Sequence, residues 1–201
     1  MVESIFLSAV IESFWKLLII LDPFLGLAIF ITLTKGMDKK QRAEQALVAT
    51  GVALGLLLFF LFFGDYILTM LGISLSGLRV AGGILLLILG IQAVLGIEFG
   101  RKKDQDTTAA AVIIGTPLLC GPGAITTTII LSNNFGKLPV LIAILAAIIV
   151  TWLFLYFAEK ISKLVGERVI EVISRVFGLI LSAMAADMIK NGIVEMIKTF
   201  K

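Results

Sequence analysis

Six long apolar runs fill most of the sequence and leave only short polar stretches between them. About 20 apolar residues in a helix span the hydrocarbon core of a bilayer. Because a helix satisfies its own backbone hydrogen bonds in lipid, the runs predict an all-α membrane protein with six transmembrane helices. No stretch between the runs can fold into a soluble core, so any activity is expected within or beside the membrane. The runs cover residues 5–34, 45–64, 77–97, 110–132, 138–158 and 173–196.

The composition excludes several classes of protein. A mean hydropathy of +1.10 with 59% hydrophobic residues is not that of a soluble domain. The sequence has no histidine, which removes Ser-His catalysis and zinc metalloprotease motifs. Cys120 is the single cysteine, so no internal disulfide can form. The net charge of +3 comes from basic residues in loops. We therefore expect no nucleic-acid partner, no metal or other cofactor, and no enzymatic activity.

The first apolar run is interrupted by an acid, a proline and a glycine at residues 21–26. Proline removes a backbone donor, and the residue before it is driven away from helical dihedrals. Freed backbone groups in hydrocarbon are costly unless protein or a water-filled cavity satisfies them. Asp22 adds an ionisable group at the same depth, where such residues are functional by default. The first span is therefore predicted to be discontinuous and to carry a site.

A second interruption, at residues 117–123, lies in the fourth run. Half-helices that begin after Pro23 and Pro122 would direct free N–H groups and positive dipole ends toward a common centre. Such ends suit a carboxylate. Nearby glycines would let a small substrate approach the backbone, and at most two of three consecutive threonines, 126–128, can face one site. The predicted substrate-binding residues are Asp22, Pro23, Gly26, Gly121, Pro122, Gly123, Thr126 and Thr127.

Three roles are open for Asp22: holding a substrate ammonium, binding and releasing a proton, and capping the helix after the break. Asp187 is the other acid deep in a span, and its spacing from Lys190 predicts a structural ion pair. Glu12 and Lys16 have the spacing of a pair on one helix face. Lys16 is otherwise interpreted as a snorkelling interfacial residue.

The two halves of the chain resemble each other weakly. Residues 78–82 align with 174–178 at an offset of 96, and Pro23 aligns with Pro122 if three residues of slack are allowed. Each half has three spans, so the second half would enter the membrane from the opposite face. Inverted repeats with interrupted helices recur in transporters. The predicted units are a first repeat at 1–97, a cytoplasmic linker at 98–109 and a second repeat at 110–201.

Small residues at 51–55, 143–147 and 178–182 are compatible with helix contacts within one subunit, although a homo-oligomer is left open. The second span is predicted to end at Gly64, with residues 66–73 forming a short interfacial helix. Six spans place eleven Lys and Arg on one side, which the positive-inside rule assigns to the cytoplasm, and both termini outside. These eleven are Lys35, Lys39, Lys40, Arg42, Arg101, Lys102, Lys103, Lys160, Lys163, Arg168 and Arg175.

Several motifs together resemble the MarC family across essentially the whole chain. The resemblance implies two inverted three-helix repeats with discontinuous first and fourth helices that hold the substrate. It also implies import of small neutral amino acids such as glycine and alanine with proton coupling, as in the Snat proteins of the family. Two positions depart from the family, whose members often have proline where this chain has Ser76 and glutamine near Asp187. The motifs are Leu21-Asp22-Pro23-Phe24-Leu25-Gly26, Leu71-Gly72-Ile73-Ser74-Leu75, Arg79-Val80-Ala81-Gly82-Gly83-Ile84 and Thr116-Pro117-Leu118-Leu119-Cys120-Gly121-Pro122-Gly123-Ala124-Ile125-Thr126.

The sequence thus predicts a secondary active transporter that works by alternating access in the inner or plasma membrane. The expected partners are a small neutral amino acid, a proton rather than sodium, and the lipid bilayer, with Asp22 as the candidate for proton coupling. A passive channel lined by the same polar breaks is the main alternative. An intramembrane protease with Asp22 and Asp187 as an aspartyl pair is a weaker one.

Overall fold

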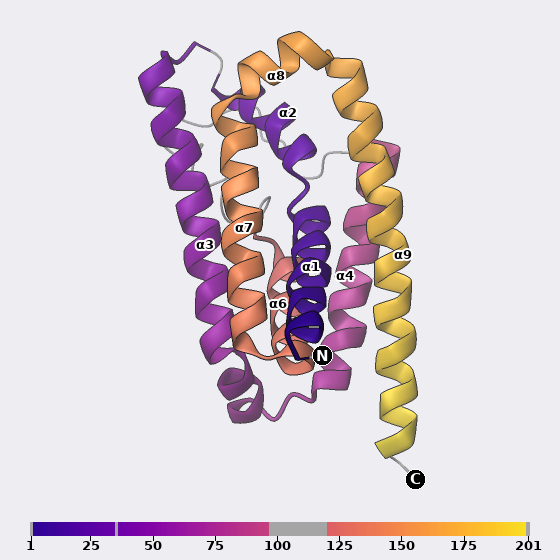
Figure 1. Ribbon diagram of the computed structural model, residues 1–201. Helices are drawn as coiled ribbons and strands as arrows, with labels where there is room; N and C mark the ends of the chain where they lie inside the picture. Colours follow the sequence, from indigo (N-terminus) through magenta and orange to yellow (C-terminus); the bar gives the residue numbers. More distant parts are fainter. Residues whose placement is uncertain (1, 35, 97–119, 200–201) are drawn as a thin grey trace.

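Every described element of the protein is an α-helix. The computed structural model describes residues 2–34, 36–96 and 120–199. The predicted all-α architecture is confirmed over these ranges. Figure 1 shows their helices, which are α1 (Val2–Leu21), α2 (Pro23–Leu33), α3 (Lys39–Met70), α4 (Leu75–Leu95), α6 (Pro122–Phe135), α7 (Lys137–Tyr156), α8 (Ala158–Val165) and α9 (Glu167–Thr199).

Five helical segments within the described ranges are long and apolar enough to cross a membrane. The remaining predicted span, 110–132, is described only from Cys120 onward, where α6 supplies 14 residues. The count of six spans and the inverted repeat therefore remain predictions. The predicted linker, 98–109, lies outside the described residues. The five segments are Ser4–Ile31, Lys39–Met70, Leu75–Leu95, Lys137–Tyr156 and Arg168–Lys198.

The long helices form one bundle with two distinct ends (Figure 1). Both ends of the described chain lie at one end of the bundle, which we call the terminal end. Helix α8 and the turn between α2 and α3 lie at the opposite end, which we call the α8 end. Helices α1 and α2 follow one another toward the α8 end, and α6 and α9 run toward the terminal end (Figure 1).

Helix α3 runs through the point where the sequence analysis ends the second span. It begins with a capping box in which Asp38 accepts from the Gln41 N–H at 2.8 Å. It then continues to Met70, so the separate helix predicted at 66–73 is wrong. A side chain at Gly64 would lie 2.5 Å from Cγ1 of Ile129 on α6. This glycine therefore permits close helix packing instead of ending the helix.

Helices α4 and α9 pack together through small residues. A Cβ atom at Gly178 would lie 2.8 Å from the carbonyl oxygen of Gly90 and 2.7 Å from Cβ of Ala93. A Cβ atom at Gly83 would lie 3.0 Å from the carbonyl oxygen of Ala185. The two helices run in opposite directions (Figure 1), and their backbones approach as closely as small-residue interfaces in membranes allow. The predicted contact at residues 178–182 is confirmed.

The other two small-residue pairs differ from each other. Ala143 and Ala147 of α7 are fully buried, as predicted for a contact within one subunit. Gly51 and Gly55 of α3 face open space instead, because a Cβ atom at either would meet nothing within 4 Å. The described helices therefore bring no atom against these two glycines, although Ala49 and Ala53 on another face of α3 are buried.

Candidate functional site

Asp22 forms the break between α1 and α2. Its backbone adopts the left-handed conformation, with φ 36° and ψ 73°, and no other described non-glycine residue has a positive φ. Pro23 at the first position of α2 explains the break, because it supplies no N–H and restricts the residue before it. A non-glycine residue in this conformation costs about 1–3 kcal/mol. The surrounding contacts must therefore hold Asp22, and the predicted discontinuity of the first span is confirmed here.

Both carboxylate oxygens of Asp22 are hydrogen-bonded. Oδ1 accepts from the N–H of Leu25 at 3.1 Å, and Oδ2 accepts from Oγ of Ser174 on α9 at 2.9 Å. Asp22 is 8% exposed and Ser174 is 6% exposed. The capping role is thus confirmed, while substrate binding and proton coupling stay predictions. Sequence reasoning missed Ser174 because no local spacing links residues 152 positions apart.

Aromatic side chains surround the first turn of α2. The Phe24 ring meets the rings of Phe154 on α7 and Phe177 on α9 edge-on, at centroid distances of 4.9 and 5.3 Å. Edge-to-face pairs of this kind add to the stabilisation from area burial. Pro23 and Gly26 are buried, and the Gly26 N–H donates to the carbonyl oxygen of Asp22 at 3.0 Å. The chain just beyond Asp22 is therefore closely packed toward the α8 end.

The second predicted break is described from Cys120 onward. Gly121 precedes α6 in an extended conformation and Pro122 is its first residue. No side chain caps this helix, unlike α2. A Cβ atom at Gly123 would lie 2.2 Å from Cδ2 of Leu86 on α4. Gly123 therefore lacks a side chain because α6 packs closely against α4. The sequence analysis instead predicts that this glycine lets a substrate approach the backbone.

The three consecutive threonines of α6 differ in what their hydroxyls do. Thr126 donates to the carbonyl oxygen of Pro122 at 2.8 Å, and Thr128 donates to that of Ala124 at 2.8 Å. The Thr127 hydroxyl is buried, and within the described structure it has no hydrogen-bond partner. Thr127 itself is 4% exposed. A buried hydroxyl without a partner is costly, so Thr127 needs an explanation that its neighbours do not.

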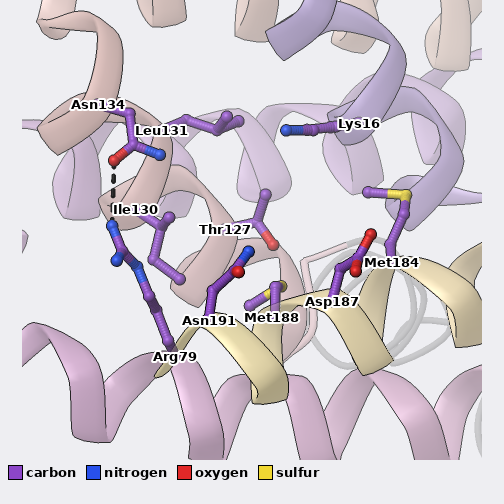
Figure 2. Close-up of a pocket in the computed structure, with 10 residues that line it drawn as sticks. All are labelled: Lys16, Arg79, Thr127, Ile130, Leu131, Asn134, Met184, Asp187, Met188 and Asn191. Carbon is purple, nitrogen blue, oxygen red and sulfur yellow. Dashed lines mark hydrogen bonds between the residues drawn. The ribbon is translucent and has the colours of Figure 1, made fainter. Parts of the chain in front are cut away.

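Thr127 lines a cavity of about 420 Å³, which we call the Thr127 cavity. Figure 2 shows side chains from α1, α4, α6 and α9 directed into it. Its volume falls within the range of small-molecule sites. Asp187 and Asn191 on its wall are exposed, whereas Thr127 is buried. Its polar lining residues are Lys16, Arg79, Thr127, Asn134, Asp187 and Asn191, and its apolar ones are Ile130, Leu131, Met184 and Met188.

Three charged side chains of the Thr127 cavity have ion-pair partners. Lys16 contacts Glu12 at 2.5 Å and Asp187 contacts Lys190 at 3.0 Å, which confirms both pairs predicted from spacing. Arg79 contacts Glu195 at 2.5 Å and donates to Oδ1 of Asn134 at 3.1 Å. Arg79 therefore joins α4, α6 and α9 at the terminal end. The partners of Arg79 lie far from it in the sequence and could not be predicted from local spacing. The same holds for the position of Lys16 on the wall of a cavity.

The structure divides the predicted site. Of the eight predicted residues, Thr127 lines the cavity, whereas the others lie at the two helix starts. Thr127 comes five residues after Pro122, which is about 7.5 Å along a helix axis. Lys16 comes six residues before Asp22, which is about 9 Å. The cavity thus ends close to the breaks without including them. Over the described ranges, no three Cys, Asp or Glu side chains gather in a way that could hold a metal ion.

Comparison with known proteins decides the family. Residues 7–197 match the MarC family of integral membrane proteins. The chain belongs to this family. Membership in the MarC family confirms the resemblance drawn from the sequence motifs, and it agrees with the apolar helices in making this an integral membrane protein.

Relatives of the chain are similar over nearly their whole length. A UPF0056 membrane protein of Methanocaldococcus jannaschii is 38% identical over 194 residues, which cover 91% of this chain and 95% of that protein. One from Archaeoglobus fulgidus is 32% identical, covering 94% of each chain. The UPF0056 membrane protein YvbG of Bacillus subtilis is 31% identical, covering 94% of this chain and 96% of its own. No solved structure matches the chain.

Proposed function

We propose that this protein is a secondary active transporter of small neutral amino acids such as glycine and alanine, coupled to protons. The observation that carries the proposal is Asp22, a buried acid at a left-handed break inside an apolar span. Non-helical backbone and an acid at membrane depth are costly and mark substrate or ion pathways.

The proposal includes six spans in two inverted repeats, 1–97 and 110–201. Two features support it. Helices α2 and α6 each begin with a proline at corresponding places in the two halves. They run toward opposite ends of the bundle, as do α4 and α9 (Figure 1). This is the relation expected of an inverted repeat whose discontinuous helices form the site.

The substrate chemistry follows from the helix starts and the acid. A helix N-terminus favours a carboxylate. The start of α6 at Gly121–Gly123 is therefore proposed to bind the carboxylate of the amino acid. Asp22 is proposed to face the ammonium group, to exchange a proton, or both. We favour the proton over sodium on the resemblance to Snat proteins. Uptake that strictly required sodium would remove this part of the proposal.

The two ends of the bundle support alternating access over a passive channel. The Thr127 cavity lies on the terminal-end side of the breaks, where α6 runs. On the α8 side, Phe24 packs against Phe154 and Phe177. Arg42 of α3 contacts Glu159 of α8 at 2.7 Å. With the basic α8 end proposed to be cytoplasmic, the structure would be open outward, as an importer is before it takes up substrate.

The protease alternative receives no support from the geometry. Ser174 touches Asp22, and Asp187 follows 13 residues later, about 20 Å along the axis of α9. Two carboxylates that share a proton must lie within about 3 Å of each other. We therefore propose no enzymatic activity for this pair.

Uptake of labelled glycine into proteoliposomes tests the proposal, with and without an imposed proton gradient. Asp22→Asn retains an oxygen that can cap α2 but cannot exchange a proton. We expect wild-type accumulation to follow the gradient and the variant to lose it. Accumulation retained by the variant would leave Asp22 as a cap only. Absence of wild-type accumulation of glycine and alanine under every gradient would withdraw the amino-acid assignment.

A further inference from the structure

The buried hydroxyl of Thr127 has the features of a group kept for a ligand. Thr126 and Thr128, its neighbours on α6, both satisfy their hydroxyls on the carbonyl four residues before. The Thr127 hydroxyl has no partner in the described structure although the residue is 4% exposed. In Figure 2 it points toward Asn191 across the Thr127 cavity. A polar molecule bound in the Thr127 cavity would give this hydroxyl the hydrogen-bond partner that it lacks.

The charges around this hydroxyl match the two ends of a zwitterion. Lys16 reaches into the Thr127 cavity from α1 and Asp187 from α9 (Figure 2). Each has one partner on its own helix, Glu12 and Lys190 respectively. An ammonium group offers three donors and a carboxylate accepts several hydrogen bonds, so both groups can take a further contact. Met184 and Met188 leave an adaptable apolar wall for a short side chain.

We propose that the Thr127 cavity is a second binding site for a small neutral amino acid, separate from the break at Asp22. Thr127 and Lys16 bind the carboxylate, and Asp187 binds the ammonium group. The inference rests on the proposed transport function and adds to it a site that substrate occupies before it reaches the helix breaks. The two proposed carboxylate-binding residues, Lys16 and Thr127, lie about 9 and 7.5 Å from the breaks along α1 and α6.

Protection of a cysteine in the cavity tests the site directly. Cys120 is the sole natural cysteine, so a Cys120→Ser background allows single labels. Asn191→Cys places a thiol on the cavity wall, and Lys198→Cys places one on the same helix outside it. The labelling rate with a membrane-impermeant maleimide is measured on the full chain in detergent, with and without alanine. Ethylamine and propionate, which carry one charged group each, serve as control solutes.

We expect alanine to slow labelling of Asn191→Cys several-fold and to leave Lys198→Cys unchanged, while neither control solute protects. Adding Thr127→Val removes the hydroxyl and keeps the shape. The alanine concentration for half-protection should then rise roughly tenfold, because the loss of one hydrogen bond to a charged group weakens binding by about that factor. Thr128→Val is the matched control and should leave this concentration unchanged.

Protection that is unchanged by Thr127→Val would place the protecting alanine at the breaks, and the second site would be wrong. Wild-type uptake of alanine without any protection of Asn191→Cys would overturn the second site and leave the transport proposal intact. Protection that depends on Thr127, in a protein that accumulates no amino acid, would support the site and remove the transport proposal.

Discussion

Ser174 and Asp22 are joined by a hydrogen bond of 2.9 Å inside the bundle, although 152 residues separate them. Asp22 sits at the break in the first span and Ser174 lies on α9, the last helix. Both are buried. The bond therefore links the two ends of the sequence at the place where the chain departs from helical geometry.

Replacement of Ser174 by alanine should destabilise the protein. The change leaves Oδ2 of Asp22 buried without its donor, and an unsatisfied buried acceptor costs about 1–3 kcal/mol. We expect a lower midpoint of thermal unfolding in detergent, whereas Ser174→Thr, which keeps a hydroxyl, should retain most of the stability. Equal midpoints for wild type and Ser174→Ala would show that this bond contributes little.

Helix packing predicts opposite outcomes for the same substitution at two glycines. Gly178→Val forces a side chain against Gly90 and Ala93 and should cost about 1–3 kcal/mol through overpacking. Gly51→Val meets open space and should change stability by no more than about 0.5 kcal/mol. Denaturant unfolding of the purified variants measures both values. A comparable loss at Gly51 would reveal a partner against α3, such as a second copy of the chain.

The contact between α3 and α8 should depend on pH. Lys163 beside Glu159, together with Arg42, holds the pKa of that carboxyl below its ordinary value. A lowered pKa means that the ionised carboxylate contributes at neutral pH, and that the contribution disappears as the pH falls through and below the ordinary range near ~4.3. The effect should be small because Glu159 is solvent-exposed.

We therefore expect Glu159→Gln to lower the thermal midpoint slightly at pH 7, with a difference from wild type that shrinks as the pH falls below about 4. Glu171→Gln is the control, since Glu171 pairs with Arg175 on its own helix. A difference between Glu159→Gln and wild type that grows toward acid pH would contradict this sign.

Labelling of intact cells tests the proposed orientation. Lys137→Cys lies at the terminal end and Lys163→Cys at the α8 end, each in the Cys120→Ser background. If the α8 end faces the cytoplasm, an impermeant maleimide should label only the cysteine at 137 until the cells are opened. Labelling of the cysteine at 163 alone would reverse the proposed orientation and place the Thr127 cavity on the cytoplasmic side of the breaks.

Features that depend on local chemistry could be predicted from the sequence. The break at Asp22 follows from the covalent structure of Pro23, and the pair of Glu12 with Lys16 follows from helix spacing. The capping of α2 is equally local, because Asp22 accepts from the N–H of Leu25 three residues later. Such features need no knowledge of which helices become neighbours.

Features that depend on neighbouring helices could not be predicted. The sequence predicts that the helix ends at Gly64. In the structure the helix continues, and a glycine is needed there because Ile129 of α6 leaves no room for a side chain. The sequence predicts that Gly123 leaves room for substrate, but Leu86 of α4 occupies that space. Thr127 differs from Thr126 and Thr128 because it lines a cavity and its hydroxyl has no hydrogen-bond partner within the described structure. In each case the deciding atom comes from a distant part of the chain.

Helix α9 is continuous over 33 residues, whereas the first span is broken. It touches Asp22 through Ser174 near one end and lines the Thr127 cavity through Asp187 further along. Between them Gly178 presses backbone against backbone on α4. Gly83 and Gly192 pack just as closely between the same two helices, so α4 and α9 are held together along their length and should move as one unit that carries Ser174 and Asp187 together. A single motion of this pair would therefore change the contacts of Asp22 and the lining of the Thr127 cavity at the same time.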